Sequence, residues 1–222
     1  MATITLNRGP LVAGDLLTRD EFLRRWEEMP DLKSAELLGG VVYMPSPLGA
    51  DHSTTDAHVT FWLQCYATHT PGCETGSNAT WHMLADAPQP DSHLRIIREC
   101  GGTSWVKDNY FHGAPELAAE VCRSSTSYDL HQKKELYQSA GVKEYLTVLL
   151  EERSVHWHRL VGGRYQTLLV NPDGLICSTV FPGLWLDPTA LLAGNMPRVL
   201  DILQRGLQSS EHAEFVRHLA KG

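Results

Sequence analysis

Apolar residues along this chain follow two patterns. In some short segments they recur at every second position, and in other stretches they recur every three to four positions. The second spacing predicts helices over residues 18–29, 50–70 and 128–140. Thr18 and Glu21 have the spacing of a helix N-terminal capping box, and Gly141 is a typical residue just beyond a helix C-terminus. The first helix is expected to end before Pro30, because proline cannot continue it.

The runs with a period of two predict β-strands. Gly39-Gly40 joins residues 34–38 and 41–44 as a hairpin, so Glu36 falls inside a strand. Further strands are predicted at residues 79–83, 92–97, 117–122, 144–150, 155–160, 165–170 and 176–181. Turn residues separate the last four of these, which indicates a β-meander.

The C-terminal part of the chain differs from the rest. Residues 189–193, 198–207 and 211–219 have helical spacing and carry paired charges. We therefore expect a helical extension over about residues 188–222, packed on a core of about residues 1–187. The 222 residues are expected to form a single domain.

Composition narrows the functional classes. A chain with 42% hydrophobic residues can bury a sizeable core, and a net charge of -7 argues against binding nucleic acid through a broad basic surface. The five cysteines contain no Cys-x-x-Cys, so neither a disulfide framework nor a thiolate zinc site is expected. We therefore expect the protein to reside in a reducing cytoplasm. No segment approaches the roughly 20 apolar residues that a membrane span needs, so we expect a soluble protein.

Two acids are the first candidates for chemistry. Asp91 follows Gln89-Pro90 where a predicted strand opens, and Glu120 lies near the end of another. Mg²⁺, or Mn²⁺ in its place, prefers oxygen ligands, which these carboxylates and the backbone carbonyl of Val121 can supply. An ion held in this way polarises a phosphodiester and lowers the pKa of a bound water.

A lysine on the following helix completes the candidate set. Lys133 falls near the centre of the apolar stripe of that helix, and Lys134 lies roughly a quarter-turn away. The stripe consists of Leu130, Leu136, Tyr137 and Ala140. A buried lysine needs a carboxylate to neutralise it, so Lys133 is expected to meet Asp91 and Glu120. The alternative is that Asp91 is an ordinary turn acid, and that Glu120 and Lys133 form a structural ion pair.

Other candidates are weaker. His156 and His158 share one face of a predicted strand but lack a third ligand, which favours exposed strand histidines over a metal site. His52, at a helix start, can line a cleft, although a capping or solvated role is favoured. Cys122 is expected to be a buried small residue rather than a nucleophile.

The chain resembles the Uma-type family of putative restriction endonucleases. The motifs that carry the resemblance are Gln-Pro-Asp91, Pro115-Glu-Leu-Ala-Ala-Glu120-Val, the run from Ser124 to Tyr137, and Gly141-Val-Lys-Glu-Tyr145. It extends from the first predicted helix through residues 178–187. The fold implied is the α/β restriction-endonuclease-like core of the PD-(D/E)xK nucleases, a mixed sheet with helices on both faces.

The resemblance also implies roles for residues. Asp91 and Glu120 match the metal-binding acids of the family, Glu36 matches its early acid as an outer or second-metal ligand, and Lys133 matches its helix-borne lysine. Cys122 stands where the wider superfamily has a lysine, so the amine is expected to come from Lys133 instead.

The activity implied is metal-dependent endonucleolytic hydrolysis of nucleic-acid phosphodiesters, with DNA as the favoured substrate. A homodimer is expected, because nucleases that cut duplexes often need one site for each strand. The alternative is a catalytically silent nuclease-fold module that binds a protein or nucleic-acid partner, which the acidic net charge supports.

Overall fold

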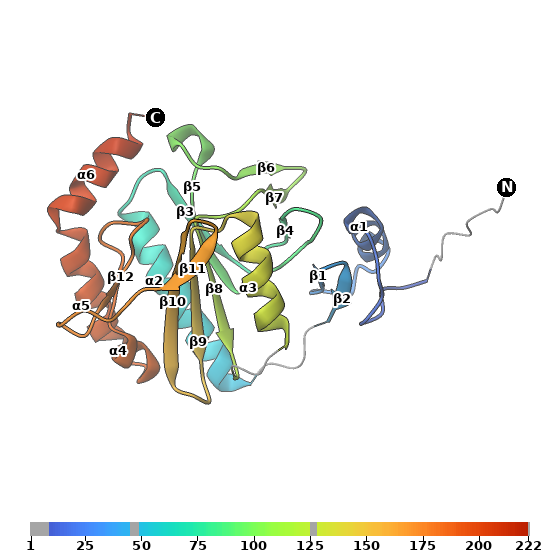
Figure 1. Cartoon of the computed structure of the whole chain (residues 1–222), viewed down its shortest axis with the longest axis horizontal. Helices are drawn as coiled ribbons and strands as arrows, with labels where there is room; N and C mark the ends of the chain where they lie inside the picture. Colours follow the sequence, from blue (N-terminus) through green and yellow to red (C-terminus); the bar gives the residue numbers. More distant parts are fainter. Residues whose placement is uncertain (1–8, 45–48, 125–127, 222) are drawn as a thin grey trace.

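A six-stranded mixed sheet forms the centre of the protein in the computed structural model, which describes residues 9–44, 49–124 and 128–221, apart from the side chains of residues 128–130 (Figure 1). Its strands are β3 (Cys73–Ser77), β5 (Ser92–Ile96), β8 (Leu117–Cys122), β9 (Glu144–Leu149), β10 (Ser154–Val161) and β11 (Arg164–Thr167). They lie in the order β11-β10-β9-β8-β5-β3. Only β8 and β9 run parallel within this sheet, and helix α3 (Tyr128–Ala140) connects them. The predicted mixed α/β fold is confirmed.

Helices cover both faces of this sheet (Figure 1). One face packs against α2 (Ala50–Thr68) and the C-terminal helices α4 (Pro188–Leu192), α5 (Met196–Leu207) and α6 (Ser210–Leu219). Helix α3 packs on the opposite face. Within β8, Ala119 and Val121 belong to the core on the α2 side, and Ala118 belongs to the core on the α3 side. Because side chains alternate along a strand, Glu120 faces α3.

The N-terminal part forms a small unit with its own core. It contains α1 (Arg19–Glu27), β1 (Glu36–Leu38) and β2 (Val41–Tyr43), and the predicted hairpin is present. Thr18 caps α1 by accepting a hydrogen bond from the N–H of Glu21, as the capping box predicts. Gly39 and Gly40 have φ angles of 59° and 75°, a conformation that glycine adopts at little steric cost in a tight hairpin turn.

This unit is tied to the rest of the protein through the segment that precedes β5. The carboxylate of Asp86 accepts hydrogen bonds from the N–H groups of Gly39 and Gly40, each at 3.0 Å. Leu37 and Ala87 form an antiparallel bridge beside them. These contacts bring the β1 strand, and Glu36 with it, next to the residues just before Asp91.

Several short strands differ from the predicted pattern. The edge strand β3, and β6 (Trp105–Lys107) with β7 (Tyr110–His112), were not expected: β3 is rich in polar and small residues, and β6 and β7 have only three residues each, too few to show a period of two. The predicted strand at residues 79–83 is only β4 (Trp81–His82), which pairs with β7 in a separate three-stranded sheet. A short 3-10 helix (Arg98–Cys100) precedes β6.

The predicted meander ends one strand early. Its first three strands, β9, β10 and β11, are confirmed, but β12 (Ile176–Cys177) pairs with β13 (Trp185–Leu186) away from the main sheet. The physical reason for this early end is that the buried carboxylate of Glu144 holds the segment after β12. Glu144 is fully buried and accepts hydrogen bonds from the side chains of Trp157 and Ser178 and from the N–H groups of Thr179 and Val180. The segment after β12 is thereby held over the start of β9.

Glu144→Ala is expected to lower the free energy of unfolding by about 3 kcal/mol, because it leaves the buried indole N–H of Trp157 and the partly buried donors of Ser178 and Val180 without their acceptor. Burial raises the pKa of this carboxyl, and the hydrogen bonds from Ser178 and Thr179 oppose that rise. Glu151→Ala is a matched control, since Glu151 pairs with Arg123 on the surface and its loss should change stability by less than about 1 kcal/mol. Urea unfolding of both variants measures the difference, and equal stabilities would contradict a structural role for Glu144.

The predicted C-terminal helices are present, and they contribute to the main core rather than lying loosely on it. Leu191, Val199, Leu203 and Leu219 belong to the same hydrophobic cluster as Trp62 of α2. Within the described ranges, no helix has both the length and the apolar character needed to cross a membrane.

Candidate active site

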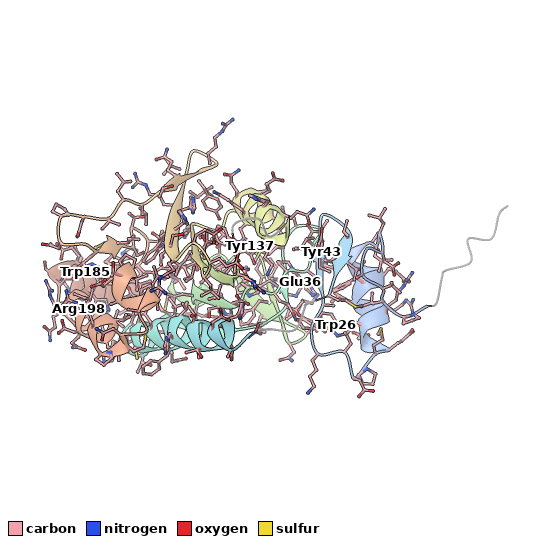
Figure 2. All side chains as sticks on the ribbon, turned by 90° about the horizontal axis from the view of Figure 1, so that it is seen from below. Trp26, Glu36, Tyr43, Tyr137, Trp185 and Arg198 are labelled. Carbon is pink, nitrogen blue, oxygen red and sulfur yellow. The ribbon has the colours of Figure 1, made fainter. Side chains whose placement is uncertain are left out.

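Lys133 is a buried cation at the centre of the candidate site. Its side chain is only 7% exposed, and its Nζ lies 3.0 Å from Glu36 Oε1 and 3.1 Å from Glu120 Oε2. The same ammonium donates a hydrogen bond to the backbone carbonyl of Gln89 at 3.2 Å. Because the side chain is buried and its ammonium meets these three acceptors, the inward direction predicted for Lys133 is confirmed. Figure 2 shows Glu36 beside Tyr137 and Tyr43, where the N-terminal unit meets α3.

Two further hydrogen bonds fix the carboxylates around this cation. Tyr137 lies one helical turn after Lys133, and its hydroxyl donates to Glu120 Oε1 at 2.7 Å. The backbone N–H of Gln89 donates to Glu36 Oε1 at 2.6 Å. Gln89 therefore contacts both Glu36 and Lys133 through its backbone, which links the N-terminal hairpin to the central sheet at the site.

Asp91 lies beside this cluster but is held by different partners. Its Oδ2 accepts a hydrogen bond from the N–H of Val121 at 2.8 Å and lies 3.6 Å from Nε2 of His52. Lys133 pairs with Glu120, as expected, but with Glu36 in place of Asp91. Glu120 points to the α3 side of β8, whereas Asp91 hydrogen-bonds to the backbone of the strand itself, and this accounts for the difference.

The charges at the site do not balance. Two carboxylates, those of Glu36 and Glu120, contact the ammonium of Lys133, and the carboxylate of Asp91 lies beside them. The formal charges of these four groups sum to two negative units. Burial raises the pKa of Glu120; Lys133 opposes this rise, while Asp91 and Glu36 add to it. Burial alone would lower the pKa of Lys133, but the three acids outweigh it and raise that pKa well above its ordinary value. The ammonium therefore stays charged, and Glu120 is prone to hold a proton unless a further cation is present.

These acids can be compared with the needs of a metal ion. Among the residues that the structure describes, no group of three or more His, Cys, Asp or Glu side chains is arranged to hold a metal. Glu36 and Glu120 are turned toward Lys133, and Asp91 toward Val121. The donors still fit Mg²⁺ chemically, because they are carboxylate oxygens and carry two negative charges in excess. Metal binding would therefore have to compete with the ammonium for these oxygens.

The other sequence candidates lie apart from this cluster or at its edge. Nζ of Lys134 lies 3.1 Å from Nε2 of His158, so the helical-face argument distinguished the two lysines correctly. His156 is exposed on the strand, as expected, but the same expectation is wrong for His158, which is partly buried beside Lys134. The capping or solvated role favoured for His52 is wrong, because Gly49 is the N-cap of α2 and the largely buried side chain of His52 lies near Asp91.

Three contributions to the site were missed or only partly foreseen. Tyr137 was expected only as part of the apolar stripe of α3, and its contact with Glu120 was not anticipated, although its position four residues after Lys133 was a signal. The backbone role of Gln89 leaves no signature in the side-chain pattern. Asp56 on α2 interacts electrostatically with Asp91 and was not considered. Cys122, which was expected to be a buried small residue, is partly buried.

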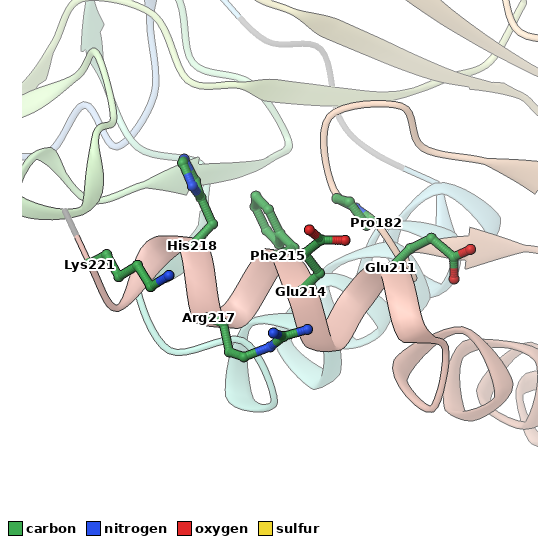
Figure 3. Close-up of a pocket in the computed structure, with 7 residues that line it drawn as sticks. All are labelled: Pro182, Glu211, Glu214, Phe215, Arg217, His218 and Lys221. Carbon is green, nitrogen blue, oxygen red and sulfur yellow. The ribbon is translucent and has the colours of Figure 1, made fainter.

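A separate hollow lies along α6, as Figure 3 shows. Its volume is about 420 Å³, and it is lined by Pro182, Glu211, Glu214, Phe215, Arg217, His218 and Lys221. Its charges are of both signs, and it shares no residue with the acids around Lys133. The hollow therefore adds nothing to the candidate site.

A mixed sheet with helices on both faces, carrying acids on neighbouring strands, defines a nuclease-like fold of the restriction-endonuclease class. The sequence profile of the Uma2 family, described as putative restriction endonuclease, matches residues 19–189. The chain therefore belongs to the Uma2 family, and the resemblance seen in the sequence is confirmed. Helices α5 and α6 lie entirely beyond the matched residues.

A crystal structure with the same fold comes from Anabaena variabilis and is described as a putative nuclease of the DUF820 family. It superposes with a TM-score of 0.62 at 18% sequence identity, covering 79% of this chain and 99% of the Anabaena chain. At this identity the likeness concerns the fold alone. No protein of curated function matches the sequence.

Proposed function

We propose that the protein is a metal-dependent endonuclease that hydrolyses phosphodiester bonds of DNA. The observation that carries this proposal is the buried ammonium of Lys133 between Glu36 and Glu120, with Asp91 beside them. A structural ion pair needs one acid for one lysine, whereas three buried or partly buried acids leave an uncompensated charge that costs stability. Such an excess is typical of a site that binds a cation.

The roles proposed for the acids follow from their chemistry. Asp91 and Glu120 would hold Mg²⁺ or Mn²⁺, and Glu36 would act as an outer or second-metal ligand. When bound, such an ion would polarise the phosphodiester and lower the pKa of its water. Because the pKa of Lys133 is raised well above its ordinary value, this residue acts as a charged donor rather than as a base. Its ammonium would orient the water or stabilise negative charge on the phosphorane.

The backbone carbonyl of Val121 is the third proposed metal ligand. The carbonyls of Glu116 and Cys122 accept hydrogen bonds from amides at the two ends of β9. Because backbone groups alternate in direction along a strand, the carbonyl of Val121 points away from β9, toward the β5 side. The N–H of Val121 already meets Asp91 on that side, which supports grouping these two residues at one ion.

Two further proposals concern the setting of the activity. A homodimer would supply one site for each strand of a duplex. A cytoplasmic location is supported by the five cysteines, which are all free thiols.

A second candidate function is a catalytically silent module that keeps the fold and binds a partner. Its support is the net charge of -7, which offers little long-range attraction for nucleic acid. The engagement of Glu36 and Glu120 with Lys133 is also compatible with a purely structural cluster.

A digestion assay separates the two functions. The purified protein is incubated with supercoiled DNA, linear DNA, single-stranded DNA and RNA, in Mg²⁺, in Mn²⁺ or in a chelator. Cleavage is expected with either metal and is expected to disappear with the chelator, because the metal supplies the activated water. The double variant Asp91→Asn/Glu120→Gln serves as the background control. Equal cleavage by this variant, or intact substrates under all conditions, would contradict the endonuclease.

A further inference from the structure

The sheet-facing side of α2 is polar in its first turns and apolar afterwards. His52, Asp56 and Thr60 recur at intervals of four residues and are all partly buried, and Leu63 and Ala67 continue the same side as buried core residues. Residues three or four apart lie on one face of a helix, so these five positions form one stripe. Burying polar groups on such a face costs free energy unless they find partners. The polar end of the stripe is the end that reaches Asp91.

The partners of this polar stripe are Asp91 and the residue next to it. Nε2 of His52 lies 3.6 Å from Asp91 Oδ2. The hydroxyls of Thr60 and Ser92 form a hydrogen bond of 2.6 Å, and Thr60 also contacts Asp56 at 3.5 Å. Ser92 is fully buried, so this bond fixes the helix against the start of β5. The stripe thus contacts a site acid at one end and the neighbouring strand residue at the other.

Both contacts of the Asp91 carboxylate with other described residues fall on the same oxygen. Oδ2 accepts the N–H of Val121 and faces the imidazole of His52. The distance of 3.6 Å is longer than a direct hydrogen bond, so the imidazole acts on the carboxylate as a neighbouring polar group. Oδ1 is left on the other side of the carboxylate. An acid held by one oxygen presents the other to a cation in a defined direction.

Asp56 brings a second carboxylate near the same imidazole. Burial raises the pKa of Asp56 to about 6, the charge of Asp91 adds to this rise, and His52 opposes it. His52 therefore interacts with an acid on its own helix and with an acid of the site. Its Nδ1 is buried without a hydrogen-bond partner among the described residues, a cost that an apolar side chain of similar size would avoid.

We propose that His52 is a positioning residue of the candidate active site, which orients the carboxylate of Asp91 for a divalent cation and is supported by Asp56 and Thr60. This inference rests on the proposed metal-dependent function. Removing a residue that contacts and orients a metal ligand commonly weakens metal binding by about 10-fold to 100-fold. A residue that merely fills space would instead be replaceable by leucine.

The test compares three variants on one helix. His52→Leu removes the polar group at similar size, and His52→Gln keeps an N–H donor near the position of Nε2. His58→Leu is the matched control, because His58 lies on another side of α2 and lines a separate hollow with Thr54 and Thr55. Two quantities are measured: the dissociation constant for Mn²⁺ by titration calorimetry, and the hydrogen-exchange rate of the Val121 amide without metal. Thermal unfolding checks the fold.

For His52→Leu we expect Mn²⁺ binding to weaken by about 10-fold and the Val121 amide to exchange faster, because the Asp91 carboxylate is less well held. His52→Gln is expected to restore Mn²⁺ affinity to within about threefold of the parent, and His58→Leu to match the parent. If His52→Leu does not fold, His52→Asn replaces it, since its amide is too short to reach Asp91.

Parental values of both quantities in His52→Leu would overturn the proposal, as would equal impairment of His52→Gln and His52→Leu. Weaker Mn²⁺ binding with an unchanged Val121 amide would also overturn it, because His52 would then act without Asp91. A parent protein that binds no Mn²⁺ would refute the proposed metal-dependent function. In that case the Val121 amide alone decides whether His52 positions Asp91.

Discussion

Lys133→Ala is expected to reduce DNA cleavage on the order of 1000-fold, because the variant lacks the charged donor proposed to stabilise the phosphorane. It is also expected to lower the free energy of unfolding by about 3 to 5 kcal/mol without metal, since removing one partner leaves buried carboxylates uncompensated. In the parent, the ammonium contacts both Glu36 and Glu120.

A divalent cation should recover part of the stability that this substitution removes. With Lys133 gone, the three acids carry one more negative charge, so Mn²⁺ should raise the stability of Lys133→Ala more than that of the parent. If Lys133→Ala loses cleavage while Mn²⁺ stabilises it more than the parent, the role of the lysine in the reaction is separated from its role in stability. A residue that only maintained the fold would regain cleavage when Mn²⁺ restored stability.

Lys134→Ala is the matched control for this substitution. Lys134 is the next residue on the same helix, but its ammonium contacts His158 rather than the acids. Single-turnover cleavage and urea unfolding, each with and without Mn²⁺, are measured for both variants. Cleavage by Lys133→Ala at the rate of Lys134→Ala would show that the amine is not needed for the reaction.

The inward direction of Lys133 could be predicted because it depends only on the helical period. A lysine near the centre of the apolar stripe of α3 must point to the core wherever that helix packs. The same local reasoning placed Glu36 in a strand through the Gly39-Gly40 turn. Local rules therefore gave the elements that carry Lys133 and Glu36, as well as the direction of the lysine.

The partners of each side chain could not be predicted in the same way. Glu36 reaches Lys133 only because Asp86 and Ala87 attach the N-terminal hairpin beside Gln89, and these contacts join segments far apart in the sequence. Gln89 acts through its backbone, which every residue type possesses. Packing between elements thus decided which acid met the lysine.

The missed strands have a similar explanation. The edge strand β3 contains a single small apolar residue, Cys73, at its buried end, so its pattern gives little sign of a strand. The meander prediction failed at β12 because the hydrogen bonds of Glu144 hold the following residues elsewhere. Neither the edge position nor this buried acceptor can be read from hydrophobic spacing.

Glu120→Gln is expected to weaken Mn²⁺ binding by at least about 100-fold and to reduce cleavage on the order of 1000-fold, because a neutral amide replaces a proposed metal ligand. In the parent, burial raises the pKa of Glu120, so a metal must displace a proton from this carboxyl when it binds at neutral pH. Parental Mn²⁺ affinity should therefore increase as the pH rises from about 6 to about 9. This pH dependence should be much weaker in Glu120→Gln.

The same raised pKa makes the metal-free parent less stable as the pH rises. The folded state binds the Glu120 proton more tightly than the unfolded chain, so this contribution to stability is complete below the ordinary pKa of 4.5 and is lost as the pH passes the raised value. The pKa of Lys133 is also raised, but from 10.5, so the lysine contributes a constant amount over this range.

Urea unfolding and Mn²⁺ titration at about pH 6 and about pH 9 measure both effects. Asp91→Asn is the comparison, since it removes another proposed ligand but keeps Glu120. It should lose cleavage like Glu120→Gln while still losing stability as the pH rises. If Glu120→Gln and the parent showed the same dependence on pH, the titrating group would be another residue, and Glu120 would have no proton for the metal to displace.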